Sequence, residues 1–592
     1  MLSLCIPSKQ TQIDGSTVID QPDLLPVPRD SDARKWNTAH MGGYWIAMAF
    51  GRPQYQVAAT AVTAGLSPGA AIGAALGCAA SGWIGATYGI NFPVLARASF
   101  GVYGNIIAVL ARAVSGVAWF GLQTYQGGQC LQVMLGAIFP SFKSFKNHLP
   151  PSAHVTSSQL LCFFLFYIIQ LPLLFIHITK LRHLFMFKVI VMPIFCLALF
   201  GWAVGRAHGF GPLFAQKTDV HGSPVALVFI SGVSSAIAGE TTLALNICDF
   251  TRFAKSPRVV VWATILSLSI PLTLGASLGV VVTSAVQVIY GVSTWNPLQV
   301  TELWSSRAAQ FFAAFCWALT AIGSNISANS TAVGNDLAIL FPRYINVRRG
   351  QYICALVSLA TCPVSLEGGY TIFLAPICGI LLADYYIRQH WQLDVAALYR
   401  RESSRYWYTH GVNWRAVAAF MLALIPSLPG FAAKINTKIK VPIGARYIFA
   451  LVWPVGVIVG GACYLLFSAV WPVHIRFLSQ PAICRSYGYH HTILQAYFLP
   501  AMHSDLAAVR ARIVEIERLI AELRAEQSAA VPQQLLHVRD VRDGRSAFLI
   551  WTSPAMSSRL KGHTTILETH NSLGVIKLLK VPPAQNIYAQ AH

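Results

Sequence analysis

The sequence predicts an all-α membrane protein, and three observations support this prediction. The 592 residues are 55% hydrophobic and only 11% charged, whereas soluble domains carry about 25% charged residues. Apolar runs of roughly 18 or more residues recur between Trp45 and Phe467, and each can cross ~30 Å of hydrocarbon. Because lipid cannot pair backbone polar groups, runs of this length must form helices that pair them internally.

The apolar runs predict about twelve transmembrane helices. Their ranges are close to 39–63, 67–89, 103–137, 157–178, 184–206, 224–247, 258–288, 307–333, 349–366, 370–388, 412–430 and 446–471. The domain boundaries that follow are a cytoplasmic N-terminal tail at 1–38, a transmembrane domain at 39–471 and a C-terminal tail at 472–592. The C-terminal tail contains a predicted amphipathic helix at 505–527, and we expect it to be otherwise poorly ordered.

Two of the predicted helices are interrupted at corresponding places. The first is broken by Gly51-Arg52-Pro53 and the sixth by Gly239-Glu240. These are the first helices of two five-helix halves, spans 1–5 and 6–10. Broken helices in matching positions indicate an inverted repeat with a binding site at its interface, near the middle of the bilayer.

The net charge of +21 does not indicate nucleic-acid binding, because no DNA-binding or RNA-binding module surrounds the basic residues. These residues lie mainly in the tails and in short loops, such as Lys180 and Arg182, Lys255 and Arg258. The positive-inside rule explains this placement and predicts that both termini are cytoplasmic. Lys434, Lys438 and Lys440 lie in a loop on the opposite side and go against this trend.

Several chemistries are excluded by missing motifs. The 12 cysteines are scattered without a C-x-x-C pair, so neither a zinc site nor a disulfide framework is indicated. The sequence contains no H-E-x-x-H and no Gly-rich nucleotide loop, so we do not expect an enzyme.

Trp119 and Gln123 are four residues apart, so they share one face of the third predicted helix. An indole face can stack on a flat heterocycle, and a carboxamide offers a donor and an acceptor. Packing with an interhelical hydrogen bond is the more common use of such residues in membrane bundles. A second polar group is Asn329, within the Ser/Asn-rich stretch Ser324–Thr331 of the eighth helix. Helix–helix hydrogen bonding could also explain most of that stretch.

Six passages occur in an order that resembles the nucleobase–cation symporter family NCS1, in particular its fungal uracil, allantoin and uridine permease branch. They are DLLPVPRDSDARKWN (Asp23–Asn37), INFPVLARASFGVYG (Ile90–Gly104), WFGLQTYQGGQC (Trp119–Cys130), LNICDFTRFAK (Leu245–Lys255), SNISANSTAVGNDL (Ser324–Leu337) with PRYINVRRGQ (Pro342–Gln351), and FLAPICGILLADYY (Phe373–Tyr386). The resemblance covers roughly residues 20–470. It implies a LeuT-like 5+5 inverted repeat with two extra helices, and import of a uracil-like or allantoin-like solute by alternating access at the plasma membrane.

The resemblance also implies roles for individual residues. Trp119, Gln123 and Asn329 match positions that bind substrate in the family. The family's cation site matches the backbone of Ala47 and Phe50, with Thr320 and Ser324. Gly323 stands where sodium-coupled relatives have a hydroxyl, so the resemblance favours a co-transported proton over sodium, with no other cofactor.

The remaining candidate residues are charged. Glu240 is an ionisable group within a predicted span, which marks a functional site by default, and we assign it to proton coupling and substrate binding; a neutral, hydrogen-bonded Glu is the alternative. Arg97, Asp249 and Arg252 are candidate gating residues. Asp249 and Arg252 could instead form a structural ion pair, and Arg97 could equally be a positive-inside anchor.

Other functions stay open at this point. The solute could be a nucleoside, thiamine or nicotinamide riboside, and a non-transporting solute sensor is the alternative of another class. The expected partners are a small heterocycle and the lipid bilayer, with no nucleic acid, and the oligomeric state is not predicted. One departure from the family concerns Met48, Gly51 and Pro53, which replace Asp and Asn residues of relatives in the broken first helix.

Overall fold

The structure is a computed structural model that describes residues 11–13, 16–18, 22–56, 68–150, 155–176, 180–211, 242–360, 369–400, 404–436, 438–472 and four strands between 537 and 580. The chain divides into two compact units, Met1–Arg476 and Phe477–His592. In the second unit, β3 (His537–Asp540), β4 (Ser546–Trp551), β5 (Thr565–His570) and β6 (Val575–Lys580) form an antiparallel sheet in that order. The predicted helix at 505–527 lies outside the described residues, and the predicted domain boundaries stay predictions.

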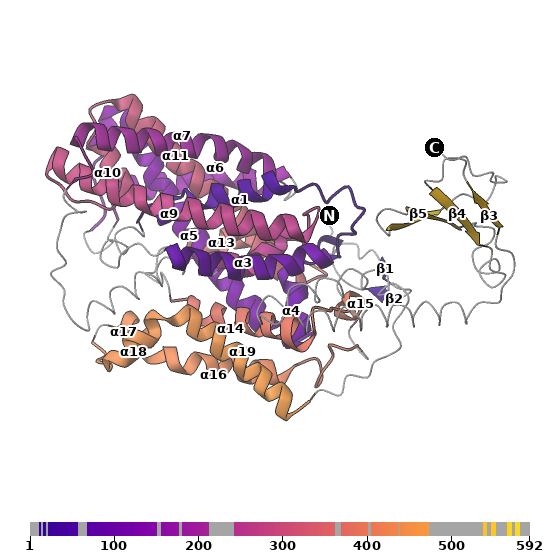
Figure 1. Ribbon diagram of the computed structural model, residues 1–592. Helices are drawn as coiled ribbons and strands as arrows, with labels where there is room; N and C mark the ends of the chain where they lie inside the picture. The colour runs from indigo at the N-terminus through magenta and orange to yellow at the C-terminus, as the bar shows by residue number, and fades with distance from the viewer. Residues whose placement is uncertain are drawn as a thin grey trace, which may run out of the picture. The chain divides into compact units, whose positions relative to one another are not determined.

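The first unit is built from long apolar helices (Figure 1). Its N-terminal half contains α1 (Thr38–Ala49), α3 (Pro68–Tyr88), the short α4 (Phe92–Phe100), α5 (Ile106–Ile138), α6 (Ser157–Gln170) with η4 (Leu171–Phe175), and α7 (Leu181–Ala207). Two short strands, β1 (Thr11–Ile13) and β2 (Ser16–Val18), precede them as an antiparallel pair.

The following part begins with a helical stretch at 242–251. It continues with α9 (Pro257–Tyr290), α10 (Pro297–Glu302), α11 (Arg307–Ser324), the π-helical segment η7 (Asn325–Thr331), α12 (Ala332–Leu340) and α13 (Val347–Ala360), then α14 (Thr371–Leu382) with the π-helical η8 (Ala383–Arg388). The last helices are α15 (Val395–Tyr399), α16 (Trp414–Leu424), η9 (Ile425–Ser427), α17 (Leu428–Ile435), α18 (Ile443–Ala450) and α19 (Val452–Val470).

The helical prediction is confirmed. Among the described residues, eight helical segments are long and apolar enough to cross a membrane. The eighth predicted span, 307–333, is longer in the structure, because α11, η7 and α12 run on without a break to Leu340. The number of spans, about twelve, stays a prediction.

The predicted break in the first span is confirmed. Helix α1 ends at Ala49, Phe50 leaves the helical conformation (φ −94°, ψ 58°), and residues 52–56 are helical again. Pro53 cannot donate a backbone hydrogen bond, which fits its place just after the break. The predicted break at Gly239-Glu240 lies outside the described residues.

A closely packed pair of helices is formed by α14 and α19, which gather with α16, α17 and α18 (Figure 1). A Cβ on Gly379 would lie 2.1 Å from the Val457 carbonyl oxygen, and one on Gly460 would lie 2.9 Å from Cα of Pro376. Small residues let membrane helices approach in this way, which replaces the hydrophobic drive that lipid does not supply.

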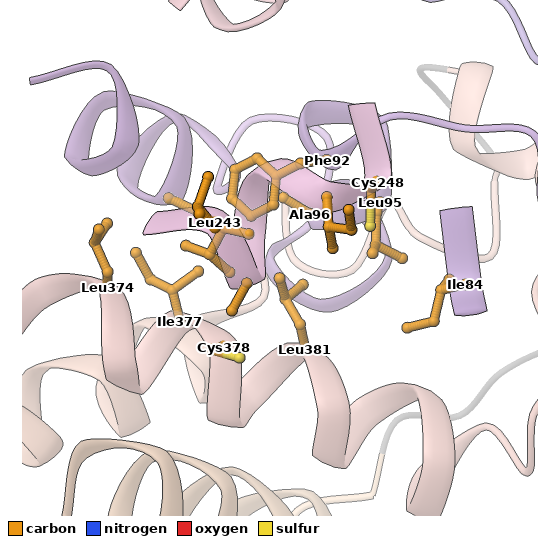
Figure 2. Packing of buried hydrophobic residues seen from close by; sticks show 14 of the residues in the cluster. Ile84, Phe92, Leu95, Ala96, Leu243, Cys248, Leu374, Ile377, Cys378 and Leu381 are labelled. Atoms are coloured by element: carbon orange, nitrogen blue, oxygen red, sulfur yellow. The ribbon is translucent and has the colours of Figure 1, made fainter. Parts of the chain in front are cut away.

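The core around α4 is apolar (Figure 2). Phe92 and Leu95 of α4 lie against Ile377 and Leu381 of α14 and Leu243 of the 242–251 helix, and all are buried. This packing fixes α4, the helix of the loop before α5, against two of the main helices.

The segment from Asp23 to Trp36 packs against the helices rather than extending away from them. Trp36 is fully buried and forms a parallel bridge with Ala254, in which its N–H donates to the Phe253 carbonyl. The Arg34 guanidinium donates to the carbonyl oxygen of Ala86, at the end of α3, at 2.8 Å. Residues 23–36 of the region assigned to an N-terminal tail therefore have fixed contacts with the helical unit.

Candidate functional site

A cavity lies between the broken first span, α5, the 242–251 helix and the α11–η7 helix. It is lined by Met48, Gly51, Pro53, Gln54, Trp119, Gln123, Thr242, Leu243, Thr320, Ser324, Ala328 and Asn329. The residues predicted to hold the solute, Trp119, Gln123 and Asn329, thus share one cavity. No charged side chain is among these lining residues.

The α5 wall of the cavity has one aromatic and one amide group. Trp119 and Gln123 stand one turn apart, and the Trp119 ring meets Tyr370 edge to face at 5.8 Å between centroids. This contact with Tyr370 helps to hold the indole in place at the cavity wall. The Gln123 carboxamide is largely buried and forms no hydrogen bond within the described part of the chain. Buried polar groups are normally paired, so this amide has bonding capacity for a ligand.

The opposite wall is the π-helical segment η7. Such segments are rare and frequently lie at functional sites, because they shift side chains relative to a regular helix. Asn329 points its amide nitrogen at the Asn325 carboxamide oxygen at 2.8 Å. The Asn329 amide nitrogen is therefore used in a bond within the protein, whereas its side-chain oxygen stays available at the cavity as a hydrogen-bond acceptor.

Asn325 acts as the support for Asn329. Its amide nitrogen donates to the Thr124 hydroxyl and to the Gln170 carboxamide oxygen, at 3.1 and 3.0 Å, and Gln170 in turn donates to Thr124. All of these side chains are fully buried. A second layer of this kind orients the group that meets a ligand.

The predicted cation residues are only partly gathered. Thr320 and Ser324 line the cavity, whereas Ala47 and Phe50 are not among its lining residues. The Thr320 hydroxyl donates to the Trp317 carbonyl of its own helix. The Ser324 hydroxyl lies 3.7 Å from the Met48 sulfur, and a thioether is a poor ligand for a hard cation such as sodium.

A lysine that the sequence analysis did not single out stands beside these residues. Lys188 of α7 is fully buried, and its ammonium forms no hydrogen bond with any residue that the structure describes. A Cβ on Gly323 would lie 2.7 Å from the Lys188 Nζ. The position that carries a hydroxyl in sodium-coupled relatives is therefore next to the Lys188 amine.

The candidate gating residues take part in buried polar contacts. Asp249 pairs with Arg112 of α5 at 3.0 Å and accepts the Phe92 backbone N–H at the start of α4. Arg112 also binds Asp336 of α12 with two nitrogens, at 2.9 and 2.5 Å. Asp249 thus forms a structural ion pair, but its partner is Arg112 and not the nearby Arg252.

The other two candidates contact loops. The Arg97 guanidinium donates to the Leu398 carbonyl, and that of Arg252 donates to the Asp23 carbonyl. Both residues are largely buried. Each therefore fastens a connecting segment to the helical unit, a contact that gating would have to release.

Several site residues were missed from the sequence. Arg112 and Lys188 are charged residues within predicted spans, and that alone marks them as candidates. Met48 and Gln54 follow from the predicted break, since residues next to an unwound segment face the site it forms. Glu240, the residue predicted for proton coupling, lies outside the described residues.

Comparisons with known proteins identify the family of this site. The family described as permease for cytosine/purines, uracil, thiamine, allantoin matches residues 26–456. The allantoin permease of Saccharomyces cerevisiae is 31% identical over 493 residues, and the alignment covers 76% of each chain. The uracil permease of the same yeast is 32% identical over 487 residues, with 76% of each chain covered.

Solved structures share the fold. A nucleobase-cation-symport-1 transporter, Mhp1, in a closed conformation with bromovinylhydantoin bound, aligns with a TM-score of 0.60 at 21% identity, over 76% of this chain and 96% of its own. Its inward-facing form aligns with a TM-score of 0.58. The predicted LeuT-like helical fold is therefore confirmed, whereas the total of about twelve helices stays a prediction. On the match across residues 26–456, the chain belongs to the nucleobase–cation symporter family, whose members are permeases and not enzymes.

Proposed function

We propose that this protein imports a planar heterocycle of the uracil or allantoin type, bound between Trp119 of α5 and Asn329 of η7. The observation that carries the proposal is the unused hydrogen-bonding capacity of Gln123 and Asn329 in the cavity. A pyrimidine dione or hydantoin edge alternates N–H and C=O groups, so it matches a carboxamide that offers both a donor and an acceptor.

The named relatives support this choice of solute. The two yeast relatives are called allantoin permease and uracil permease, a third is called uridine permease, and the solved transporter holds a hydantoin. These compounds share a flat ring with an imide or ureide edge. The indole face of Trp119 can stack on such a ring, a contact typical of aromatic recognition of bases.

We propose further that transport is coupled to a proton, and Lys188 supports this part. A sodium ion needs a cage of oxygen ligands, whereas here a buried ammonium abuts Gly323 and the Ser324 hydroxyl lies against a sulfur. Gly43 of α1 packs on Met186 and Val189 of α7, so the lysine belongs to the junction of α1, α7 and α11. An unpaired buried charge is costly. Protonation of Lys188 is therefore easier when water can enter the junction, and this couples proton binding to opening of the junction.

The plasma membrane, with both termini cytoplasmic, is the proposed location. The basic loop residues support this orientation through the positive-inside rule. Transport would then proceed by alternating access. The broken first span and α9 move together against α5 and α11, and this movement exposes the cavity to each side of the membrane in turn.

Uptake in a yeast that lacks its own permeases tests the proposal. Radiolabelled uracil and allantoin are offered with a competing panel of purines, pyrimidines and nucleosides. Saturable uptake of one of them, inhibited by ring compounds with an imide or ureide edge, is the expected result. Specific binding without accumulation would instead indicate a sensor, and uptake of none would reject the solute class.

The coupling is tested on Lys188 in the same cells. Uptake by the wild-type protein is expected to rise at acidic external pH and to fall with a protonophore. Replacement of sodium in the medium should leave the uptake rate unchanged. Lys188→Ala is expected to lose the pH dependence while surface expression persists. The double variant Lys188→Ala/Gly323→Ser places a hydroxyl at position 323, as in sodium-coupled relatives, and removes the Lys188 Nζ with which a side chain at 323 would clash. Sodium dependence of the wild-type protein would overturn the proton assignment without affecting the solute.

A further inference from the structure

Three helices of the transporter begin at the same place. Trp36, just before α1, pairs with Ala254 just before α9, and its ring meets Phe185 near the start of α7 at 6.1 Å. The three helices also pack against one another along their lengths. The N-termini of α1, α7 and α9 therefore converge. Each carries the positive end of a helix dipole, and the first N–H groups of a helix have no partner within the helix itself.

Basic side chains surround these three N-termini. We call this set the basic seam: Lys35, His40, Lys180, Arg182, His183, Lys255 and Arg258. Arg182, His183 and Lys255 all act electrostatically on His40, which shows that residues from α1, α7 and the start of α9 are close. Most of the seam is exposed, and in the part of the chain that the structure describes no carboxylate pairs with any member.

The basic seam continues into two apolar stripes. On α7, His183 is followed at helical spacing by the exposed residues Phe187, Ile190 and Ile194. On α9, Arg258 is followed every fourth residue by the exposed residues Trp262, Leu266 and Ile270. Residues at this spacing lie on one helix face. Because α7 and α9 are in contact, the two stripes present positive charge at one end and hydrocarbon-like surface below it.

We propose that the basic seam binds the headgroup of an anionic phospholipid whose acyl chains lie along the exposed stripes of α7 and α9. A phosphate at three convergent helix N-termini finds both N–H donors and a favourable dipole, and the basic side chains add charge-assisted hydrogen bonds. The apolar stripes favour a lipid over a soluble phosphate. The assignment rests on the proposed orientation, which places the seam at the cytoplasmic leaflet, where anionic lipids are enriched.

The bound headgroup has a mechanical consequence. Without an anion, like charges on α1, α7 and α9 repel each other and favour separation of the three N-termini. A headgroup that contacts all three helices neutralises this repulsion and braces α7 against α1 and α9. Since Lys188 and Gly43 lie further along the same α1–α7 contact, the lipid would stabilise the packed form of the junction beside the cavity.

Thermal unfolding of the purified full-length protein in neutral detergent tests this proposal. Dioctanoyl phosphatidylserine and dioctanoyl phosphatidylinositol phosphate are titrated, with dioctanoyl phosphatidylcholine and inorganic phosphate as separate arms. We expect both anionic lipids to raise the unfolding midpoint in a saturable way, and phosphatidylcholine and inorganic phosphate not to. An equal shift with inorganic phosphate would assign the seam to a soluble anion and overturn the lipid.

Matched charge variants complete the test. Lys180→Gln/Arg182→Gln/Lys255→Gln removes three seam charges, and Lys438→Gln/Lys440→Gln/Arg446→Gln removes three exposed charges elsewhere. The first is expected to weaken lipid binding at least ~10-fold, because it removes three of the charges that attract an anionic headgroup, and the second is expected to bind like wild type. Equal weakening in both would show that only net charge matters, and unchanged binding in the first would reject the seam. Because no solute is used, failure here leaves the transport proposal standing.

Discussion

Helix α5 carries two polar clusters that differ in how their hydrogen bonds are used. Near its middle, Gln123 forms no bond within the described residues and Asn329 leaves its oxygen at the cavity. About three turns earlier, Arg112 is bonded to Asp249 and to both oxygens of Asp336. Both clusters are largely buried, so burial does not separate them. Unused bonding capacity marks the place for a solute, and saturated capacity marks the place that holds the helices together.

The largest expected effect is on the saturated cluster. Arg112→Met leaves two buried carboxylates without their cation, so we expect a loss of about 3–5 kcal/mol of stability, the usual cost of breaking a buried pair. Detergent-solubilised protein should then unfold at a clearly lower temperature in size-exclusion measurements. The triple variant Arg112→Met/Asp249→Asn/Asp336→Asn should recover most of the lost stability, because it removes the two unpaired carboxylate charges as well. A single variant as stable as wild type would contradict the role of the cluster.

The next effect is on the open cluster. Gln123→Ala should abolish saturable uptake, a fall of at least ~100-fold in kcat/KM, because a site built to hydrogen-bond its ligand loses that group. Stability and surface expression should not change, since Gln123 bonds to no described side chain. Gln132→Ala is the control on the same helix, as its amide donates to Ser158 instead. Unchanged uptake kinetics in Gln123→Ala would remove it from the site.

A smaller effect is expected from Asn325, which is itself fully hydrogen-bonded but orients Asn329 of the open cluster. Asn325→Ala frees the Asn329 nitrogen and removes the bonds to Thr124 and Gln170. We expect KM to rise about 10-fold, with kcat less affected, in line with one lost orienting contact of about 1.4 kcal/mol. Ser327→Ala, whose hydroxyl only bonds back to its own helix, should keep the wild-type KM. A rise in both variants would indicate general damage to the helix.

The smallest effect is expected from Trp119→Phe. Trp119→Phe keeps an aromatic face against Tyr370, so KM should rise only a few-fold, whereas Trp119→Ala should cost about 1–3 kcal/mol of stacking. Uptake kinetics in parallel cultures give the comparison. If Phe and Ala reduced uptake equally, the indole would be acting through its N–H and not through its face.

Much of the open cluster could be predicted from the sequence. The spacing of Trp119 and Gln123 fixes them on one face of a helix, and the Gly51-Arg52-Pro53 interruption locates the break that borders the cavity. These are local features, set by helix geometry and by the missing donor of proline.

The saturated cluster could not be predicted in the same way. Arg112 meets residues 137 and 224 positions further along the chain, and only tertiary packing selects Asp249 over other acidic groups. The same holds for Lys188. Its neighbour Gly323 belongs to α11, and only the structure shows that the missing side chain of Gly323 leaves room for the lysine. Charged residues within spans were visible, but their partners were not.

The packing of residues 23–36 affects how the protein should be engineered. The Tyr399 hydroxyl donates to the Leu24 carbonyl, and the Val347 N–H lies 3.4 Å from the Asp23 carboxylate. A truncation at residue 38, which composition alone would suggest, removes these anchor points together with the indole of Trp36. Fluorescent or affinity fusions belong before residue 20, with the native stretch from Asp23 onward left intact.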